Sequence, residues 1–419
     1  MRPFRVGVFA CATLLLGVTV LSGSAQTNKP PEPSSQPTSE SAIEQIKKAV
    51  VFLQGTYTIP EPRATNGAMR TQTLPGTGFL IFIPDLRLGP DRGEAFLVTN
   101  KHMIREPSPT GVLGEGPYFQ RIVMRMNAKH PSADGNQLAV IPLPVVDEGG
   151  NLDWFVHSDE AVDLAITPVR LSTQELDFKT LQQDLFATKA VLTKEQVNEN
   201  DEILFAGLFS WSPGAKKNLP IVRHGKLARL LEEPIPLDRN HPEKTVDVHL
   251  AEVMSFGGNS GSPVFLRIGG IREGAGTFLG YRYYLLGVMQ GFFPEGVAFA
   301  IEVAELRGSA AQNSGLAAVI PCEKIMEILE APRARAYRTL VAAQFAVEQG
   351  SVSDAERLYK EGIEILEISA PLHSDLASAL QAYANFLRKM KRSPEAAPLE
   401  QRAQQIRSNV NTDRMHPRY

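Results

Sequence analysis

Apolar positions along this chain follow two different periods. Up to about residue 330 they gather in short runs that glycines and polar turn residues interrupt, which is typical of strands. Over roughly the last ninety residues they recur with a helical period among Ala, Leu, Glu, Gln and Arg, and strand-like runs are almost absent. The pattern therefore predicts a mainly β region followed by an all-α region.

Two of the early runs predict a β-hairpin. Residues 76–83 read Gly-Thr-Gly-Phe-Leu-Ile-Phe-Ile and residues 95–99 read Ala-Phe-Leu-Val-Thr, with a polar, Pro- and Gly-rich loop between them. Residues 41–50 have helical spacing and lead into a strand that begins at Val50. Folded structure is therefore expected to begin near Ser41.

The most informative segment is the run of small residues around Ser260. Residues 257–265 read Gly-Gly-Asn-Ser-Gly-Ser-Pro-Val-Phe. Glycines on both sides of the serine allow a tight turn, so the backbone N–H groups of Gly258 and Ser260 can converge on one point and bind an oxyanion there. A serine hydroxyl is a poor nucleophile on its own, so this interpretation requires a histidine base and a carboxylate close in space.

His102 is the favoured base among the eight histidines, because it alone follows a strand-like apolar run. The carboxylate is expected in a third strand. Asp163 fits because it lies inside the short apolar run 161–166, where burying an unpaired carboxylate would be costly. The competing residues lie in the preceding polar stretch and are interpreted as solvated: Asp153, Asp159 and His157.

These segments, in the order His, Asp, Ser, resemble the trypsin-like serine peptidases. The disulfide-free bacterial branch, which includes the HtrA-type proteases, is the more similar one. Residues 201–208 and 313–321 resemble two further strands of that family, the second of them a closing strand before a helix. The resemblance implies a mainly β, double six-stranded barrel over residues 41–330 and a serine endopeptidase that cleaves protein or peptide substrates.

The resemblance also implies a role for each site residue. Ser260 would attack the scissile carbonyl, His102 would take its proton and pass it to the leaving amine, and Asp163 would orient the imidazole. Gly258 and Ser260 would form the oxyanion hole. Met254 would lie at the base of a substrate pocket for a medium-sized apolar side chain. This chemistry needs no cofactor and no metal ion.

The chain departs from the digestive members of the family at Asn259, where they carry an aspartate that pairs with a newly cut N-terminus. Activation by cleavage of a pro-segment is therefore not implied. A second hypothesis is a catalytically silent or latent adaptor with the same fold, because the loops at 105–117 and 215–220 could cover the cleft. Esterase chemistry uses the same triad, but the His, Asp, Ser order and the sequence context of Ser260 disfavour it.

The C-terminal region contains a two-copy repeat. The shift that superimposes its copies lays Phe345 on Phe386, Ala343 on Ala384, Ala355 on Ala396, Leu358 on Leu399, Gly362 on Ala403 and Ile365 on Ile406. Gly350 lies between the paired helices of the first copy, and Lys391 takes its place in the second. Residues 335–410 thus resemble tetratricopeptide repeats, which implies protein binding; a plain helical appendage is the alternative. Two copies are fewer than the roughly three that an independent solenoid needs, so docking on the protease or on a partner is expected.

The N-terminus predicts export. Arg2 and Arg5 precede an apolar run over residues 6–21, and cleavage is expected after Ala25. Residues 1–25 are therefore interpreted as a signal peptide, residues 26–40 as an extended Pro- and Ser-rich linker, and the protein as periplasmic or secreted. A membrane anchor formed by an uncleaved signal is the alternative; after cleavage no membrane span is expected. Cys322 would then be the only cysteine, which excludes an intramolecular disulfide.

Composition adds little to this picture. A length of 419 residues predicts more than one domain, and a net charge of −3 with 43% apolar residues is ordinary for a globular protein. The basic clusters at 216–217 and 389–392 lack interleaved aromatic residues, so they do not indicate nucleic-acid binding. The expected partners are protein or peptide substrates and a protein bound by the repeats.

Overall fold

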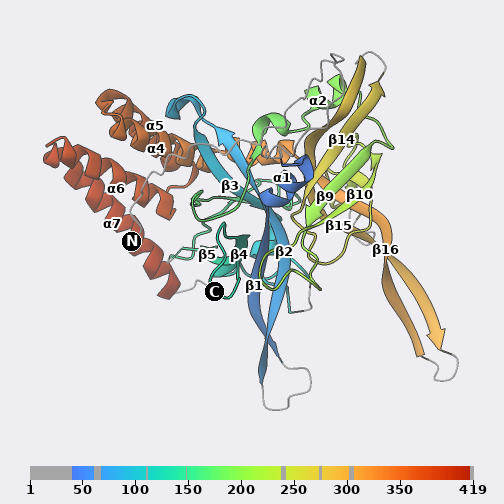
Figure 1. Cartoon of the computed structure of the whole chain (residues 1–419). Coiled ribbons are helices and arrows are strands. Elements are labelled where there is room, and N and C mark those ends of the chain that lie inside the picture. Colours follow the sequence, from blue (N-terminus) through green and yellow to red (C-terminus); the bar gives the residue numbers. More distant parts are fainter. Residues whose placement is uncertain are drawn as a thin grey trace, which may run out of the picture.

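The computed structural model describes residues 40–60, 68–109, 112–147, 149–236, 242–272, 276–301 and 306–415. The expected signal peptide (1–25) and nearly all of the expected linker (26–40) lie outside these residues and stay predictions. One N-terminal helix, a mainly β region and a group of C-terminal helices follow one another along the described chain (Figure 1). None of the helices described there combines the length and apolar character needed to cross a membrane.

The folded chain begins with α1 (Ala42–Ala49). The Ser41 side chain accepts a hydrogen bond from the backbone N–H of Glu44, which caps the first turn as serine commonly does. Ile46 is fully buried on the inner face of the helix. The first strand follows at Val50 without a linker, as the sequence predicts.

The first half of the β region is an eight-stranded sheet. Its strands are β1 (Val50–Pro60), β2 (Met69–Pro84), β3 (Gly93–Thr99), β4 (Arg121–Asn127), β5 (Leu138–Pro144), β6 (Phe155–Val156), β7 (Ala165–Pro168) and β8 (Leu181–Gln182). They lie in the order β5-β4-β1-β2-β3-β7-β6, and β8 pairs with β2. The predicted hairpin is β2 and β3, which pair antiparallel with Phe79 opposite Val98.

The sequence predicts two closed six-stranded barrels, but this first sheet is open. Only the second half of the β region forms a closed barrel. One of its edges is β5, where Pro142 and Pro144 have no N–H to offer to a further strand. The other edge is β6, which is only two residues long. Neither edge can therefore form the ladder that would close the sheet.

The second half is a closed barrel of six strands in the order β10-β13-β16-β15-β14-β9. They are β9 (Glu202–Gly207), β10 (Ile221–Arg229), β13 (His249–Glu252), β14 (Pro263–Arg272), β15 (Gly276–Ile301) and β16 (Leu306–Pro321). The remaining elements of this half are α2 (Lys189–Lys194), β11 (Ile235–Pro236) and β12 (Thr245–Val246). As expected from residues 313–321, β16 closes the barrel and leads into α3 (Glu323–Glu330). Figure 1 shows β1–β2 and β15–β16 continuing beyond the sheets as two-stranded ribbons.

The two halves of the β region share a core. Alternate residues of one strand face opposite sides, so a single strand can contribute both to this shared core and to the core of its own half. In β2, Phe79 and Ile81 pack in the core between the halves, whereas Leu80 packs in the core of the first sheet. In β14, Phe265 belongs to the shared core and Val264 to the core of the barrel. Both strands therefore lie at the contact between the halves.

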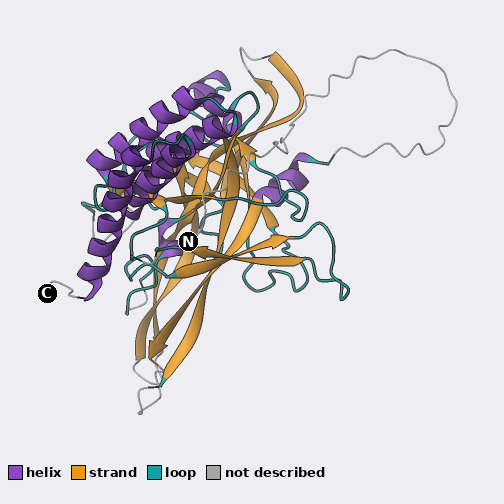
Figure 2. Cartoon of the chain, turned by 90° about the vertical axis from the view of Figure 1, so that its left-hand side faces the viewer, coloured by secondary structure: helices purple, strands orange, loops and turns teal. Residues whose placement is uncertain are grey.

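The helical module consists of α4 (Pro332–Glu348), α5 (Val352–Ser369), α6 (Ser374–Lys389) and α7 (Ser393–Met415). These helices lie side by side in one layer against the β region (Figure 2). Ala343 and Ala384, which the repeat superimposes, are both fully buried. Gly350 and Lys391 also match, since both have positive φ angles, of 75° and 61°. The described helices thus form two pairs of similar construction.

The first helix pair packs on the loop between β2 and β3. Leu88, in the short 3-10 helix η1 (Leu86–Leu88), is only 3% exposed because it lies in the core of the helical module. The guanidinium of Arg92 lies over the Phe345 ring, 5.1 Å from its centroid. A face of α4 is therefore covered by the chain's own β region.

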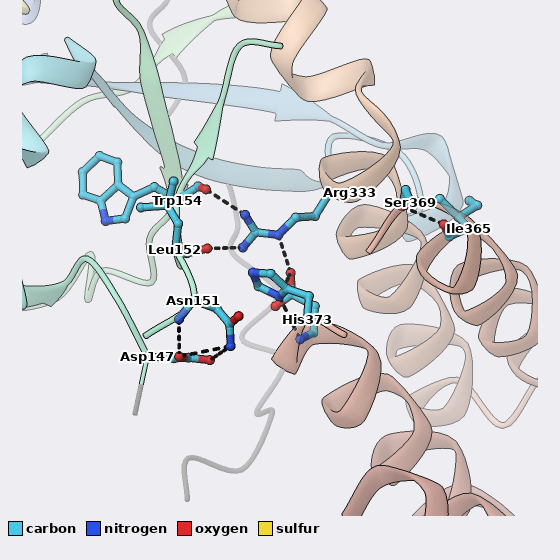
Figure 3. Close-up of polar contacts among 9 residues, drawn as sticks. Asp147, Asn151, Leu152, Trp154, Arg333, Ile365, Ser369 and His373 are labelled. Carbon is cyan, nitrogen blue, oxygen red and sulfur yellow. Dashed lines mark hydrogen bonds and ion pairs between the residues drawn. The ribbon is translucent and has the colours of Figure 1, made fainter. Parts of the chain in front are cut away.

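A second docking contact is made by Arg333 of α4. Its guanidinium donates to the backbone carbonyls of Leu152, at 2.6 Å, and Trp154, at 2.9 Å, and to the Asp375 carboxylate, at 2.6 Å (Figure 3). One side chain thus joins the β5–β6 segment to both helix pairs.

Candidate active site

His102 and Asp163 form a tightly connected pair. His102 lies in the 3-10 helix η2 (Lys101–Ile104), immediately after β3. Its backbone N–H donates to Asp163 Oδ1 at 2.8 Å, and its ring Nδ1 lies 2.6 Å from Asp163 Oδ2. A carboxylate accepts hydrogen bonds, so Nδ1 carries a proton, and in the neutral form of the ring Nε2 would be the acceptor. Both side chains are largely buried, at 11% and 15% exposure.

Asp163 precedes a strand rather than lying within one, which corrects the sequence-based expectation. It lies in the loop between β6 and β7, two residues before β7 begins. Its carbonyl accepts a hydrogen bond from Asn100 Nδ2 at 2.9 Å and one from the N–H of Lys101 at 3.2 Å. The segment on each side of His102 therefore holds the aspartate in place.

Ser260 lies in a tight loop, here called the serine turn (residues 256–262). Gly258 and Gly261 have φ angles of +97° and +83°, which L side chains rarely adopt. A Cβ on Gly261 would also lie 2.0 Å from the Thr77 carbonyl oxygen, so glycine is required there. In the described structure, the N–H groups of Gly258 and Ser260 donate to no protein acceptor. They are free to bind a ligand oxygen.

The hydroxyl of Ser260 forms no hydrogen bond with His102 in this structure. It donates to the backbone carbonyl of Gln290 at 3.2 Å. His102 Nε2 is buried and has no hydrogen-bond partner among the described residues. Catalytic hydrogen bonds often form only when substrate is bound.

A cavity of about 360 Å³ adjoins the pair, lined by Lys101, His102, Leu113, Gly114, Glu160, Ala161, Asp163 and Gln290. His102 and Asp163 line the cavity directly, and Ser260 is hydrogen-bonded to the carbonyl of one of its lining residues, Gln290. Lys101 forms a 2.8 Å ion pair with Glu160, and this hydrogen bond holds the pKa of the glutamate below its usual range. The site is therefore a polar depression with the histidine at its wall.

Asn259 orders the serine turn without any charge. It is 2% exposed; its Nδ2 donates to the Leu208 carbonyl at 2.7 Å, and its Oδ1 accepts from the N–H of Phe256 at 2.8 Å. An aspartate could not donate the first of these bonds. The turn is thus held by the uncharged amide of Asn259.

The two loops suspected of covering the cleft lie in different places. Part of the 105–117 loop borders the site, because a Cβ on Gly114 would lie 3.0 Å from the Cβ of His102. In the 215–220 loop, Asn218 bonds to the Arg125 carbonyl and to Asn127 on β4. The second loop is thus anchored on the first sheet.

The expected pocket residue, Met254, is 50% exposed, and its carbonyl accepts a hydrogen bond from Arg223 at 3.1 Å. It does not line the cavity described above. Its role in substrate selection stays a prediction.

Two residues interpreted as solvated are not. His157 has a side chain that is 9% exposed and lies 2.8 Å from Glu327 of α3. Asp153 lies near Asp147 and Asp375; burial, together with these like charges, raises its pKa to about 6. Both are partly covered by helices that follow much later in the chain. Within the described residues, no group of three or more His, Cys, Asp and Glu side chains is placed to hold a metal ion.

Sequence reasoning missed three polar contacts that shape the serine turn. They come from Thr77 on β2, Ser210 in the loop after β9 and Gln290 on β15. None carries a signal in the local sequence, because each acts on a residue far along the chain.

Comparisons with known proteins give distant likenesses. No protein-family model and no curated protein matches the chain. Among solved structures it is similar to Rv3671c from M. tuberculosis, in the inactive form of a serine-to-alanine mutant, with 14% identity over 72% of this chain and 96% of that chain and a TM-score of 0.32. It is also similar to the thermostable serine protease AL20 from an extremophilic microorganism, with 11% identity over 67% of this chain and 95% of that chain and a TM-score of 0.32.

Proposed function

We propose that this protein is a trypsin-like serine endopeptidase that cleaves protein substrates with His102, Asp163 and Ser260. The observation that carries the proposal is the His102–Asp163 pair, joined by two hydrogen bonds beside a glycine-rich turn. That turn presents a serine and two free backbone N–H groups. A base oriented by a carboxylate, a nucleophile and an oxyanion site are the parts that acyl transfer requires.

The reaction follows from these positions. As the Ser260 Oγ–carbon bond forms, the hydroxyl proton passes to His102 Nε2, and Asp163 stabilises the imidazolium. The N–H groups of Gly258 and Ser260 bind the oxyanion. The peptide C–N bond then breaks as Nε2 returns the proton to the leaving amine. Water, activated by the same nitrogen, releases the acyl group and restores Ser260.

The test compares the full chain with Ser260→Ala and Asp163→Asn, using a fluorophosphonate probe and cleavage of casein. Ser260→Ala should lose both labelling and cleavage. Asp163→Asn should lower kcat by roughly 10⁴-fold, the order found for triad aspartates. Ser212→Ala, which changes an exposed serine in the loop after β9, is the matched control and should behave as wild type. A folded wild type that neither labels nor cleaves would refute the proposal.

A second candidate is a latent protease or an adaptor with the same fold. It is favoured by the Ser260–Gln290 hydrogen bond and by the unpartnered His102 Nε2, which together describe a resting site. Labelling that appears only after a binding protein is added would support latency. No labelling under any condition, with retained binding of a partner, would support the adaptor.

We also propose that the helical module binds a protein partner through α6 rather than α4, since α4 is covered by the β region. The polar side of α6 carries Gln381 and the exposed Asn385, hydrogen-bonded to each other at 3.2 Å. Replacing both with glutamate should abolish capture of a partner and leave casein cleavage unchanged. Unchanged capture would refute this placement.

Export is the last part of the proposal. It rests on the N-terminal sequence alone, with release of a mature protein that begins at Gln26 in the periplasm or outside the cell. N-terminal sequencing of the protein from its producing cell tests it. An intact Met1 would favour the membrane anchor.

A further inference from the structure

The first four residues of the serine turn, Phe256 to Asn259, form a defined β-turn. The N–H of Asn259 donates to the Phe256 carbonyl at 3.0 Å, which closes the turn around Gly257 and Gly258. Gly258, the third residue, has a φ angle of +97°. A positive φ at this position occurs in type II and type I′ turns, whereas a type I turn requires a φ of about −90° there. Type I′ also needs a positive φ at the second residue, and Gly257 does not have one. The turn is therefore of type II.

The type of this turn decides where the Gly258 N–H points. Type I and type II turns differ by a rotation of about half a revolution of their central peptide plane, here the plane between Gly257 and Gly258. The described peptide bonds are all trans, so the Gly257 carbonyl and the Gly258 N–H point in opposite directions. With glycine at both central positions, the backbone can adopt either type at little steric cost. Whatever fixes the Gly257 carbonyl also fixes the proposed oxyanion donor.

Ser210 holds that carbonyl. Its hydroxyl donates to the Gly257 oxygen at 3.1 Å from the loop that follows β9. Among the described residues, no other side chain donates a hydrogen bond to this oxygen. The Ser210 Cβ would also lie 3.4 Å from a Cβ on Gly258, so the loop and the turn are in direct contact.

The loop that carries Ser210 is itself fixed. The Leu208 N–H donates to Thr77 Oγ1 at 2.9 Å, and the Leu208 carbonyl accepts from Asn259 Nδ2 at 2.7 Å. Thr77 Oγ1 also donates to the carbonyl of Gly258, at 2.7 Å, and so holds the next peptide plane of the turn. Ser210 therefore acts from an anchored loop on the Gly257–Gly258 peptide plane, which Thr77 does not hold.

We propose that the Ser210 hydroxyl is a positioning group that selects the type II form of the turn and thereby directs the Gly258 N–H into the oxyanion hole. The inference rests on the proposed function. Without the Ser210–Gly257 hydrogen bond, part of the population adopts the type I form, in which the Gly258 N–H faces away from the oxyanion. That part of the population is inactive.

The experiment uses the full chain with three variants at exposed or half-buried serines of one loop. Ser210→Ala should lower kcat about three- to tenfold with KM unchanged, the range expected from losing one modest hydrogen bond. The same variant should bind a peptide aldehyde, whose adduct carries an oxyanion, more weakly by a similar factor. Ser210→Thr, which keeps the hydroxyl, should restore both values. Ser212→Ala, the matched control, should match wild type, and all three should unfold at the wild-type temperature.

Each outcome decides the matter. Wild-type kcat and aldehyde affinity in Ser210→Ala would overturn the positioning role while leaving the proposed function intact. Equal losses in Ser210→Ala and Ser210→Thr would also overturn it, because the loss would then not depend on the hydroxyl. A wild type that is inactive and unlabelled would remove the proposed function, and this inference with it.

Discussion

Two of the contacts between parts of this chain differ in their chemistry. The barrel seam, where the first sheet meets the serine turn, is made of neutral groups: Thr77 donates to the Gly258 carbonyl, and its own N–H donates to the Ser260 carbonyl at 3.0 Å. The module seam, where α4 meets the β2–β3 loop, is rich in charge. There Arg87 bonds both Asp85, at 2.7 Å, and the buried Thr339, at 3.0 Å.

The two seams are therefore expected to respond differently to pH and salt. Hydroxyl-to-carbonyl bonds do not titrate, so the geometry around Ser260 is expected to be insensitive to pH and salt. The module seam combines the apolar side chain of Leu88 with ionisable groups, so its strength should vary with pH. The site and the helical module can thus be perturbed separately.

The largest effect is expected from Leu88→Ala, which removes the apolar anchor of the module seam. Truncating a leucine that is 3% exposed should cost about 3 kcal/mol of unfolding free energy, within the range for buried leucines. Urea denaturation measures it. The matched control is Leu86→Ala two residues earlier, because Leu86 is 90% exposed and its truncation should be nearly neutral. Equal effects of the two changes would show that Leu88 does not anchor the module.

Thr77→Val tests the barrel seam. It leaves a buried carbonyl at Gly258 and a buried N–H at Leu208 without their partner, at a cost of about 2 kcal/mol. Fluorophosphonate labelling should slow as well, because the serine turn loses its support. Thr77→Ser keeps the hydroxyl and should retain most of both properties. A valine variant as stable and as reactive as wild type would contradict the account of this seam.

Glu94 gives the module seam its pH dependence. Burial raises its pKa to about 7, against the opposing effects of a hydrogen bond with Tyr337 and the charges of Arg338 and Arg170, while Asp85 adds to the rise. The unfolded chain loses this proton near pH 4.5, so between that value and about 7 the folded state binds more protons. The contribution of Glu94 to stability is therefore greatest below pH 4.5 and is lost as the pH rises to about 7.

The measurement is urea denaturation of wild type and Glu94→Gln at a series of pH values from 4.5 to 8. The unfolding free energy of Glu94→Gln, relative to that of wild type, should increase as the pH rises. Parallel profiles would show that Glu94 does not titrate in this interval.

The smallest effect on stability is expected when an ion pair outside both seams is broken. Arg388 and Glu400 form a 2.6 Å ion pair on exposed surfaces of α6 and α7. Exposed pairs are screened by solvent and contribute little, so Glu400→Gln should leave the unfolding temperature unchanged within error. A clear drop would mean that charge on the helical module matters generally, and not only at the seam.

The candidate site was predictable where its residues carry local signals. His102 follows a strand, and Ser260 lies between glycines that permit positive φ angles; the structure brings His102 and Asp163 together. The details depend on distant parts of the chain. Thr77 acts on Gly258 across 181 positions, and no local pattern reports such a contact. Asp153 looked solvated because the helices that bury it begin far later in the sequence.

The sequence by itself determined the order of β and helical regions, the β2–β3 hairpin and the repeat that places Ala343 and Ala384 alike. Apolar period and glycine position are local properties, and local structure follows them directly. Only the tertiary structure decided that the first sheet stays open while the second closes, and that Leu88 fills the helical core. It also decided that Ser210 holds the turn beside Ser260. These features depend on which surfaces pack against one another once the elements have formed. The free energy of that packing comes from residues that are far apart in the chain.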